Sequence, residues 1–338
     1  MTKLRYLPDV VPGYRRVKHG RGFCYLDVRG VRITDARKLQ RFRALVIPPA
    51  WKNVWISPSK RGHLQVTGID EDGRKQYLYH PEWTAEKQQE KLMRMVAFGE
   101  ALPSFRKQIA KDLRRQTFDK VKVIALALRA MEETLMRVGN EQYRRKYGSH
   151  GLTTLKKKHL KISGETAVFQ FRGKKGVKQK ISVDHKDLVE QLILLRNLPR
   201  PYLFQYINEE KQVIRLKAAD INRYIQNYTN PEFSSKDYRT WYAGLWALRL
   251  FAERIDGIGE KDCKPHILSV LDSVSQRLGN TRTVCKQYYV PDRLVSAFED
   301  GSLLPYLENS RAGRNIRTDR AAERQLLAFL RCVTGRSS

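Results

Sequence analysis

The spacing of apolar residues changes near residue 80, and this change constrains the fold most. Between Gly22 and His80, short runs alternate apolar and polar residues and are separated by Gly-, Pro- and Asp-rich turns, a pattern typical of β-strands. Beyond residue 81 the apolar residues mostly recur every three or four positions, as in amphipathic helices. A length of 338 residues allows two domains. We therefore expect an α+β protein, with a small antiparallel sheet domain over residues 1–88 and a larger, mainly α-helical domain over residues 89–338.

The first domain is expected to consist of short strands around one short helix. Residues 1–20 are basic and interrupted by Pro and Gly, which suggests a loose arm. The acidic turn that ends in Gly73 predicts a hairpin, and Asp35 is placed to start the helix. Basic and aromatic residues interleave along the last strand: Arg74, Lys75, Gln76, Tyr77 and Tyr79. This mixture suits contact with phosphates and bases, although an ordinary polar sheet face has the same composition.

Two arginines of the second domain are placed near expected helix ends. A stripe of apolar residues from Ile124 to Val138 predicts a helix that ends at Gly139, with Arg137 in its last turn. A cation is favoured there simply by the helix dipole. Arg239, in contrast, falls in the expected first turn of a long helix, where the dipole disfavours a cation, so an external anion would suit it.

A hairpin and a tyrosine pair are the other two features that suggest chemistry. Between residues 156 and 183 the apolar period returns to two, and residues 173–176 form the expected tip, which carries Lys174. A lysine beside glycine is usually an ordinary solvated turn residue. Further along, Gly279 is expected to end one helix, and a short new helix delivers Tyr288 and Tyr289 close to Arg282 and Lys286. Half-buried packing is the simplest role for such a pair, but a phenolate stabilised by cations can attack a phosphodiester.

The composition favours a nucleic acid as the partner. Lys+Arg exceeds Asp+Glu by 65 to 35, a net charge of +30, and the excess is spread along the chain. A general basic protein or a ribosome-associated factor would share this property. The four cysteines form no CxxC motif and no metal-ligand cluster, so we expect reduced thiols and no metal. The longest apolar run, residues 123–128, is too short to span a membrane, and no phosphate-binding loop for ATP is present.

Taken in order, the motifs resemble the catalytic domain of type IB DNA topoisomerases, closest to the compact poxvirus-like form found in bacteria. The resemblance rests on R-V-G-N-E-Q-Y, F-R-G-K, K-D-Y-R-T-W and L-G-N-T…Y-Y, with I-P-P-A-W-K-N-V-W-I-S-P, G-H-L-Q-V-T-G and G-R-K-Q-Y in the first domain. It covers roughly residues 20–335, and it implies a DNA-clamp domain followed by a catalytic domain of the tyrosine recombinase and type IB topoisomerase kind.

The resemblance implies specific roles. Arg137 and Arg239 would clamp the scissile phosphate, Lys174 would protonate the departing 5′ oxygen, and Asn280 would donate a further hydrogen bond. Tyr289, nine residues after Asn280, would be the nucleophile that forms a 3′-phosphotyrosyl bond. The family also places four residues at the DNA: Gln76, Tyr77, Tyr79 and Tyr143. The enzyme would relax positive and negative supercoils of double-stranded DNA without ATP, metal or another cofactor, as a monomer in the bacterial cytoplasm at the nucleoid.

Two departures from related proteins are informative. Many relatives carry histidine where Asn280 stands, and an amide can donate a hydrogen bond but cannot become a cation. Tyrosine recombinases usually have histidine three residues before their second arginine, where this chain has Lys236. That difference favours relaxation over site-specific strand exchange. A noncatalytic architectural DNA-binding protein is the third possibility, but it would have no reason to hold Arg137, Lys174, Arg239 and Tyr289 together.

Overall fold

The chain divides into two compact units, Met1–Lys91 and Leu92–Ser338. The structure is a computed structural model and describes residues 3–253, 263–307 and 320–335. The division falls inside one continuous helix, α2 (Pro81–Leu113). This helix extends as far as Leu113 because its apolar residues, from Leu92 onward, are buried in the second unit.

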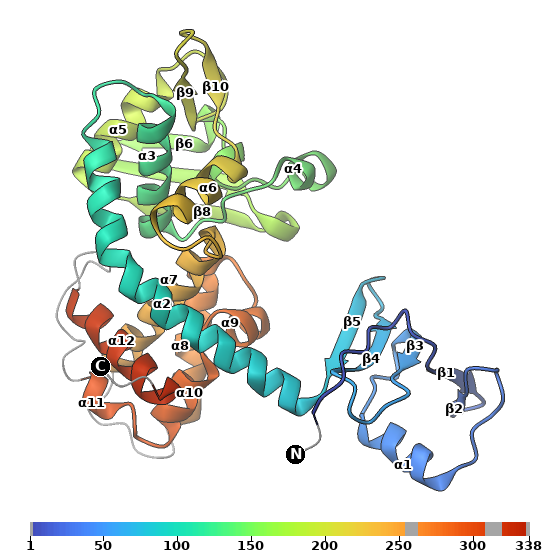
Figure 1. Ribbon diagram of the computed structural model, residues 1–338. Coiled ribbons are helices and arrows are strands. Elements are labelled where there is room, and N and C mark those ends of the chain that lie inside the picture. The colour runs from blue at the N-terminus through green and yellow to red at the C-terminus, as the bar shows by residue number, and fades with distance from the viewer. Residues whose placement is uncertain (1–2, 254–262, 308–319, 336–338) are drawn as a thin grey trace. The chain divides into compact units, whose positions relative to one another are not determined.

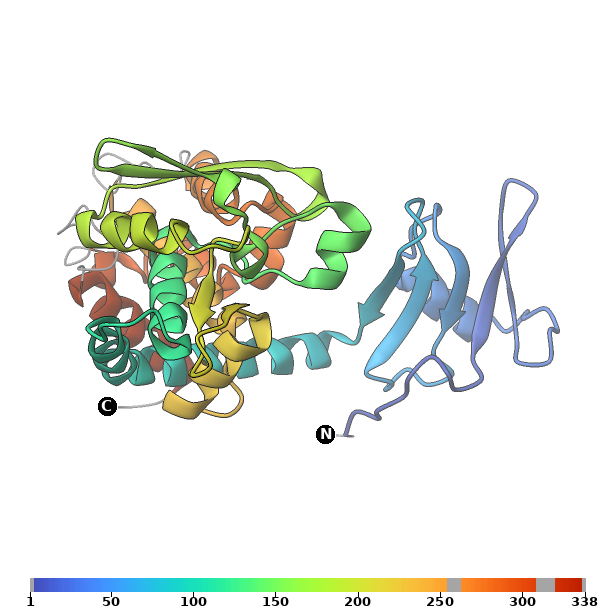
Figure 2. The ribbon, with the colours of Figure 1, turned by 90° about the horizontal axis from the view of Figure 1, so that it is seen from above.

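Unit 1 is a five-stranded antiparallel sheet with one helix, in the order β2-β1-β3-β4-β5 (Figure 1). Its elements are β1 (Tyr14–His19), β2 (Gly22–Leu26), α1 (Ala36–Ala44), β3 (Lys52–Ile56), β4 (Leu64–Ile69) and β5 (Lys75–Tyr79). The Asp35 carboxylate accepts a hydrogen bond from the Lys38 N–H (2.8 Å) and so starts α1 as expected. Phe42 of α1 packs into the core on one face of the sheet, with Val54 and Val66 among its neighbours (Figure 2).

The expectation of a loose arm over residues 1–20 was wrong. β1 lies inside the sheet, between β2 and β3, and Arg5 forms a parallel bridge with Gly62. The strand has no apolar alternation because its buried inward residue is Arg16, whose guanidinium donates to the carbonyl oxygens of Ile47 (2.9 Å), Pro48 (2.8 Å) and Trp51 (2.9 Å). Residues 31–34 form no strand of the sheet, and only an isolated bridge between Leu26 and Arg32 is present there.

Unit 2 is mainly helical and contains two small antiparallel sheets, β6-β7-β8 and β9-β10. Beyond α2, its elements are α3 (Lys120–Thr134), α4 (Glu141–Tyr147), β6 (Leu160–Ser163), β7 (Thr166–Arg172), β8 (Lys178–Val183), α5 (Lys186–Arg196), β9 (Gln205–Ile207), β10 (Val213–Arg215), α6 (Ala218–Tyr228), α7 (Ser235–Glu253), α8 (Cys263–Leu278), α9 (Arg282–Tyr288), α10 (Asp292–Glu299), α11 (Leu304–Leu307) and α12 (Arg320–Thr334). The two-domain α+β architecture expected from the sequence is therefore present.

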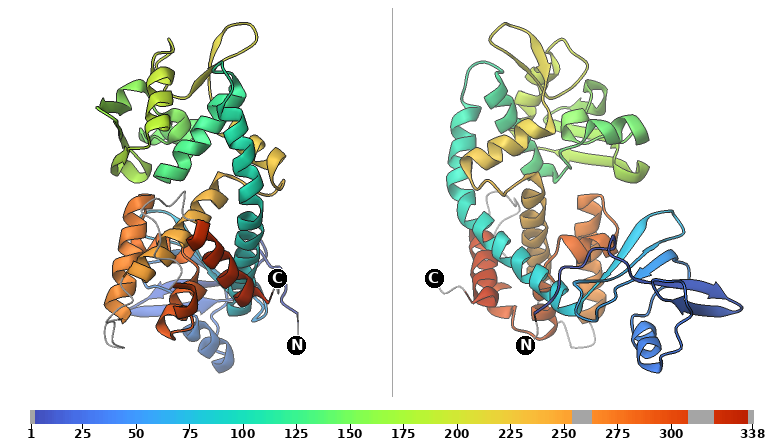
Figure 3. Two further views of the ribbon diagram at one scale, coloured as in Figure 1. Left: turned by 90° about the vertical axis from the view of Figure 1, so that its left-hand side faces the viewer. Right: turned by 45° about the vertical axis from the view of Figure 1, so that its right-hand side comes forward.

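The core of unit 2 forms around α3 and α7. Every residue of α3 from Lys122 to Leu128 is buried, and α7 contributes the fully buried rings of Tyr238, Trp241 and Tyr242. The helix α12 packs beside α7 and α2, far from them in sequence (Figure 3). No helix in the described ranges is both long enough and apolar enough to cross a membrane.

The expected end of α3 was wrong, and the difference matters for the site. The helix stops at Thr134, because Leu135 adopts a left-handed conformation (φ 51°), so Arg137 lies in the loop that follows. The apolar stripe predicted too long a helix because Leu135 and Val138 still pack against the core after the helix has ended. Gly139 has a left-handed backbone (φ 89°) and lies close to the Gly151 backbone. A Cβ added to Gly139 would be only 3.0 Å from the Gly151 main chain.

Candidate active site

Side chains from three segments of unit 2 line one open pocket of about 1030 Å³. Arg137 comes from the loop after α3, Lys174 from the turn between β7 and β8, and Asn280 and Tyr289 from the two ends of the α9 segment. Arg239 of α7 lies beneath the pocket and is 4% exposed, with its guanidinium carbon 5.4 Å from the centre of the Tyr289 ring. The fold thus brings together all five residues that the sequence suggested for catalysis.

The two arginines are held by backbone carbonyl oxygens at helix ends. Arg239 donates to the carbonyls of Leu135, after α3, and Leu278, at the end of α8 (2.8 Å for the latter). Arg137 donates to the carbonyl of Gly279 (3.2 Å) and to Oδ1 of Asn280. Helix C-termini leave carbonyls without partners, and their dipoles favour cations. Main-chain carbonyls therefore already hold Arg239 in the structure, and the expectation that an external anion would suit this residue stays a prediction.

Asn280 is placed by a backbone motif. Gly279 (φ 60°) donates to the Gln276 carbonyl (3.0 Å), and the Asn280 N–H donates to the Ser275 carbonyl (2.9 Å). These are the two bonds of a Schellman motif, which confirms Gly279 as the end of α8. Thr281 then accepts from the Val284 N–H (3.3 Å) and caps α9, so the chain turns and returns to Tyr289.

Tyr289 lies at the C-terminal end of α9, half-buried against the core, whereas Tyr288 beside it is 50% exposed. Burial raises the pKa of the Tyr289 phenol, but Arg239 and Arg137 oppose this and bring the pKa below the ordinary value of 10.0. The cations that act on Tyr289 are thus these two arginines. Arg282, which lies close to Tyr289 in the sequence, is instead paired with Asp272 (2.5 Å).

Lys174 lies at the tip of the expected hairpin. β7 and β8 pair antiparallel, with Arg172 opposite Lys178, and residues 174–176 form a short 3-10 turn. The Gly173 N–H donates to the Val177 carbonyl (2.8 Å) and closes the turn. The Lys174 side chain is exposed and lines the pocket.

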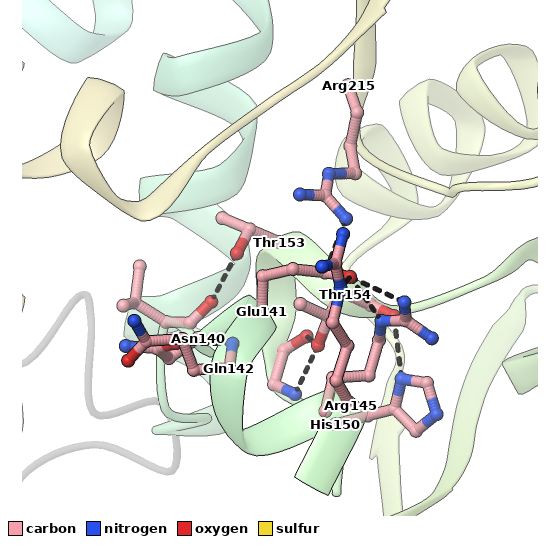
Figure 4. A network of polar contacts seen from close by, with 11 residues as sticks. Asn140, Glu141, Gln142, Arg145, His150, Thr153, Thr154 and Arg215 are labelled. Carbon is pink, nitrogen blue, oxygen red and sulfur yellow. Dashed lines mark hydrogen bonds and ion pairs between the residues drawn. The ribbon is translucent and has the colours of Figure 1, made fainter. Parts of the chain in front are cut away.

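Tyr143 lies on α4, a seven-residue helix in which no residue is buried. The helix is capped by Asn140 and held by Glu141, whose carboxylate pairs with Arg144 (2.5 Å) and with Arg215 of β10 (2.5 Å) (Figure 4). The hydrogen bond from Arg144 and the charge of Arg215 lower the pKa of Glu141 to about 2. The Tyr143 ring is 50% exposed, on a helix that is strongly basic.

Three further predicted contact residues lie on β5 in unit 1, but not on one face. Tyr77 and Tyr79 are exposed and stacked, with ring centres 6.1 Å apart, and the Lys75 amine lies 5.7 Å from the Tyr77 ring. Gln76 points to the opposite face, where its amide donates to Asp70 (2.7 Å). The alternation of a strand separates neighbours in this way, so Gln76 and the tyrosines form two different surfaces.

The sequence did not single out two other residues that line the pocket, Gln179 and Arg277. Arg277 stacks over the Trp246 ring (4.4 Å) and donates to the Glu133 carbonyl (3.2 Å). Gln179 is the sole polar residue on the inward face of β8, a signal that the alternating pattern of the strand contained. No disulfide joins any of the four cysteines, all of which lie within the described residues.

Comparison with known protein families decides the identity of this arrangement. The family model described as the catalytic core of eukaryotic DNA topoisomerase I matches residues 80–300, well over half of the chain. The chain belongs to the type IB DNA topoisomerase family. A second model, the N-terminal domain of bacterial DNA topoisomerase IB, matches residues 22–70. The five residues at the pocket all fall within the first match, whereas Gln76, Tyr77 and Tyr79 lie between the two.

Curated relatives of this topoisomerase agree. DNA topoisomerase 1B of Acanthamoeba polyphaga mimivirus is 30% identical over 298 residues, which cover 86% of this chain and 89% of the relative. DNA topoisomerase 1B of Vaccinia virus (strain Copenhagen) is 24% identical over 249 residues, covering 71% and 74%. A solved structure of the XerH site-specific recombinase bound to DNA aligns with a TM-score of 0.36 and 16% identity, over 59% of this chain and 50% of that one, a likeness too distant to support an argument.

The resemblance found in the sequence is thereby confirmed. The chain is a type IB DNA topoisomerase, an enzyme that cleaves DNA through a tyrosine nucleophile and religates it, and its partner is double-stranded DNA. The two family models and these curated relatives name topoisomerases, and they name neither a site-specific recombinase nor a noncatalytic architectural protein.

Proposed function

We propose that Tyr289 is the nucleophile of this topoisomerase and that Arg137, Lys174, Arg239 and Asn280 support its reaction. The observation that carries this assignment is the contact between Tyr289 and Arg239, in which a buried guanidinium lies 5.4 Å from the phenol ring at a pocket lined by the other three residues. No cation from the described residues lies over the Tyr288 ring, which is 50% exposed.

In the cleavage step, the Tyr289 hydroxyl oxygen attacks the phosphorus of the scissile diester and its proton passes to solvent. Arg137 and Arg239 bind the nonbridging oxygens, where negative charge accumulates, and the Asn280 amide donates to the same group. The bond to the 5′ oxygen breaks, and Lys174 transfers a proton to that oxygen. The products are a 3′-phosphotyrosine and a free 5′ hydroxyl.

Relaxation and resealing need no further energy source. The phosphotyrosyl diester conserves the energy of the broken bond, so the 5′ hydroxyl can attack it and return its proton to Lys174. Between the two steps, the free strand rotates about the intact one and releases supercoils of either sign. Two arginine forks supply the charge stabilisation that Mg²⁺ supplies in other phosphoryl transfers, so the reaction proceeds without metal or ATP.

The remaining assignments concern DNA binding. We propose residues 1–88 as a DNA-clamp domain that contacts the duplex through Tyr77 and Tyr79, with Gln76 contributing from the other face of β5, and residues 89–338 as the catalytic domain, with Tyr143 at the DNA. The enzyme acts as a monomer, because its five catalytic groups come from one chain. A bacterial cytoplasm, at the nucleoid, is the proposed place of action.

Relaxation of supercoiled plasmid in EDTA and without ATP tests this assignment. The wild-type chain, Tyr289→Phe and the adjacent control Tyr288→Phe are compared, and SDS is used to trap covalent protein–DNA adducts. We expect the wild type and Tyr288→Phe to relax the plasmid and to form a 3′ adduct, and Tyr289→Phe to bind DNA without doing either.

The adjacent pair makes the result decisive. Activity of Tyr289→Phe together with inactivity of Tyr288→Phe would move the nucleophile to Tyr288. A wild-type enzyme that relaxes DNA only after Mg²⁺ or ATP is added would contradict the metal-free, ATP-free part of the proposal and leave the nucleophile in place.

A further inference from the structure

Gln179 breaks the apolar pattern of its strand. Along β8, Lys178 and Lys180 are exposed, whereas Ile181 is half-buried and Val183 is buried on the inward face, next to the helices. Gln179 belongs to the inward row, where its partner across the sheet is Phe171. A polar side chain at an apolar position is a local inconsistency, and such inconsistencies concentrate at functional sites.

The Gln179 side chain packs against two glycines. A Cβ added to Gly279 would lie 2.8 Å from Nε2 of Gln179, and one added to Gly173 would lie 3.1 Å from its Cγ. Both distances are closer than ordinary van der Waals contact, so a Cβ at either position would force the Gln179 side chain to move. Gly173 directly precedes Lys174, and Gly279 directly precedes Asn280.

The Gln179 carboxamide is also unpaired. It forms no hydrogen bond within the described part of the chain, and it lines the same pocket as Lys174, Asn280 and Tyr289. Its contribution in the free protein is therefore contact and shape, because the side chain fills the space between the Lys174 turn and the Asn280 turn.

Lys174 needs such support more than the other proposed catalytic residues do. Arg137, Arg239 and Asn280 are anchored by hydrogen bonds, but Lys174 has no side-chain partner among the described residues and its four-carbon stem is flexible. The direction of its amine therefore depends on where the hairpin tip is held. The tip is closed on itself by the Gly173–Val177 bond, and Gln179 is the side chain that contacts both it and Gly279.

We propose that Gln179 is a positioning residue that holds the Lys174 turn against the Gly279–Asn280 turn and so aligns Lys174 with the leaving 5′ oxygen. This inference rests on the proposed role of Lys174 as the general acid. It extends that role, because it names the contact that sets the distance between the acid, on the hairpin, and the nucleophile, on the helices.

The test is single-turnover cleavage of a duplex by Gln179→Ala, with DNA affinity measured in parallel. General acid catalysis contributes roughly 10²- to 10⁴-fold, so misalignment of Lys174 is expected to slow cleavage by about tenfold while affinity stays unchanged. Gln179→Met, which keeps the length and the packing but not the amide, is expected to retain most of the rate.

The decisive readout is a second substrate in which sulfur replaces the 5′ bridging oxygen at the scissile phosphate. A thiol has a pKa of about 8.5, so the sulfur leaves as a thiolate without a proton donor. On this substrate the deficit of Gln179→Ala is expected to disappear largely, which also shows that the variant is folded. Wild-type cleavage by Gln179→Ala on the ordinary substrate, or a deficit that persists with sulfur, would overturn the proposal.

Two controls separate this inference from the function on which it rests. Lys174→Ala is run on both substrates: if sulfur does not restore its rate, the general acid assignment fails, and if sulfur restores Lys174→Ala but not Gln179→Ala, only the positioning role fails. Gln170→Ala changes the same residue type on β7, in the row that points away from the helices, and is expected to match the wild type on both substrates.

A glycine substitution tests the contact from its other side. Gly173 has φ −85°, so Gly173→Ala introduces a Cβ without backbone strain and displaces Gln179. It is expected to slow cleavage in the wild-type background and to have little further effect in Gln179→Ala, since residues in contact give nonadditive effects. Additive effects of the two changes would contradict the contact as the source of alignment.

Discussion

At the scale of single residues, the site holds two cations close to a phenol, and neither arginine pairs with a carboxylate among the described residues. Arg239 and Arg137 are bound by neutral carbonyl oxygens and by the Asn280 amide, so neither charge is cancelled before DNA arrives. Both charges act on Tyr289 and lower the pKa of its phenol. An ion pair with Asp or Glu would have anchored the arginines equally well but would have removed most of this effect.

The lowered pKa of Tyr289 predicts the pH dependence of cleavage. Because the two arginines favour the phenolate, the limb of the rate that rises with pH should have its midpoint below pH 10, the ordinary pKa of tyrosine. Arg137→Ala removes one cation and should move this limb to higher pH as well as slow the reaction. Single-turnover cleavage between pH 5 and pH 10 measures both, and an unchanged limb in Arg137→Ala would contradict the assigned cause.

At the scale of elements, a buried ionic network connects the helices that carry the site. Arg106 of α2 pairs with Glu132 of α3 (3.1 Å) and with Glu323 of α12 (2.6 Å), and it donates to the Tyr242 hydroxyl of α7 (2.5 Å). Tyr242 in turn donates to Glu132 (2.8 Å). Arg239 lies one turn before Tyr242 on α7, so the network fixes two of the helices that position the pocket.

Removal of Arg106 should therefore destabilise unit 2 strongly. Arg106→Met leaves Glu132, whose side chain is 2% exposed, as a buried charge without its cation, at a cost of about 3–5 kcal/mol. The matched control is Arg331→Met, which breaks the surface pair between α12 and Glu100 of α2 and should cost at most about 1 kcal/mol. Urea unfolding compares the two, and equal losses would show that the network is not the stronger link.

The short helix α4 depends on Glu141 in a pH-dependent way. The pKa of Glu141 in the folded protein, about 2, lies below the ordinary 4.5, so its ion pairs stabilise the fold above about pH 4.5 and are lost as the pH falls toward 2. Glu141→Gln should lower DNA affinity at neutral pH, because α4 buries no residue that could hold it in place. Its free energy of unfolding should differ from that of the wild type at pH 7, and this difference should shrink as the pH falls below about 4.5 and vanish only below about pH 2. A constant difference across this range would exclude ionisation of Glu141 as the cause.

At the scale of the whole molecule, a net charge of +30 predicts steeply salt-dependent DNA binding. Each phosphate contact releases counterions and contributes about −0.9 to the slope of log affinity against log salt. Arg145→Ala, which removes an exposed cation of α4, should make that slope shallower by about this amount if α4 contacts a phosphate. Tyr289→Phe should keep the wild-type slope, because it changes chemistry and not charge. A titration of fluorescent duplex at several salt concentrations provides the comparison.

The sequence predicted which residues meet at the pocket better than it predicted the path of the chain between them. The helix end at Gly279, the cap of α1 at Asp35 and the hairpin tip at Lys174 each have a local cause, so local patterns were sufficient. The end of α3 and the strand β1 were missed because distant packing decides them: Leu135 stays in the core after its helix has ended, and Arg16 is bound by carbonyls more than thirty residues away. The hydrogen-bond partners of Arg239 could not be predicted either, because the Leu135 and Leu278 carbonyls lie far from it in the sequence.

The Leu278 carbonyl oxygen accepts hydrogen bonds from Arg239 (2.8 Å) and, more weakly, from Arg137 (3.4 Å), and this has a consequence for how the enzyme can be studied. A side-chain scan would register Leu278 as an ordinary buried leucine, since any apolar residue there presents the same carbonyl. Variation among homologues at this position would likewise report packing alone. One hydrogen-bond acceptor of the site is therefore a main-chain carbonyl, which neither side-chain mutagenesis nor sequence comparison can detect.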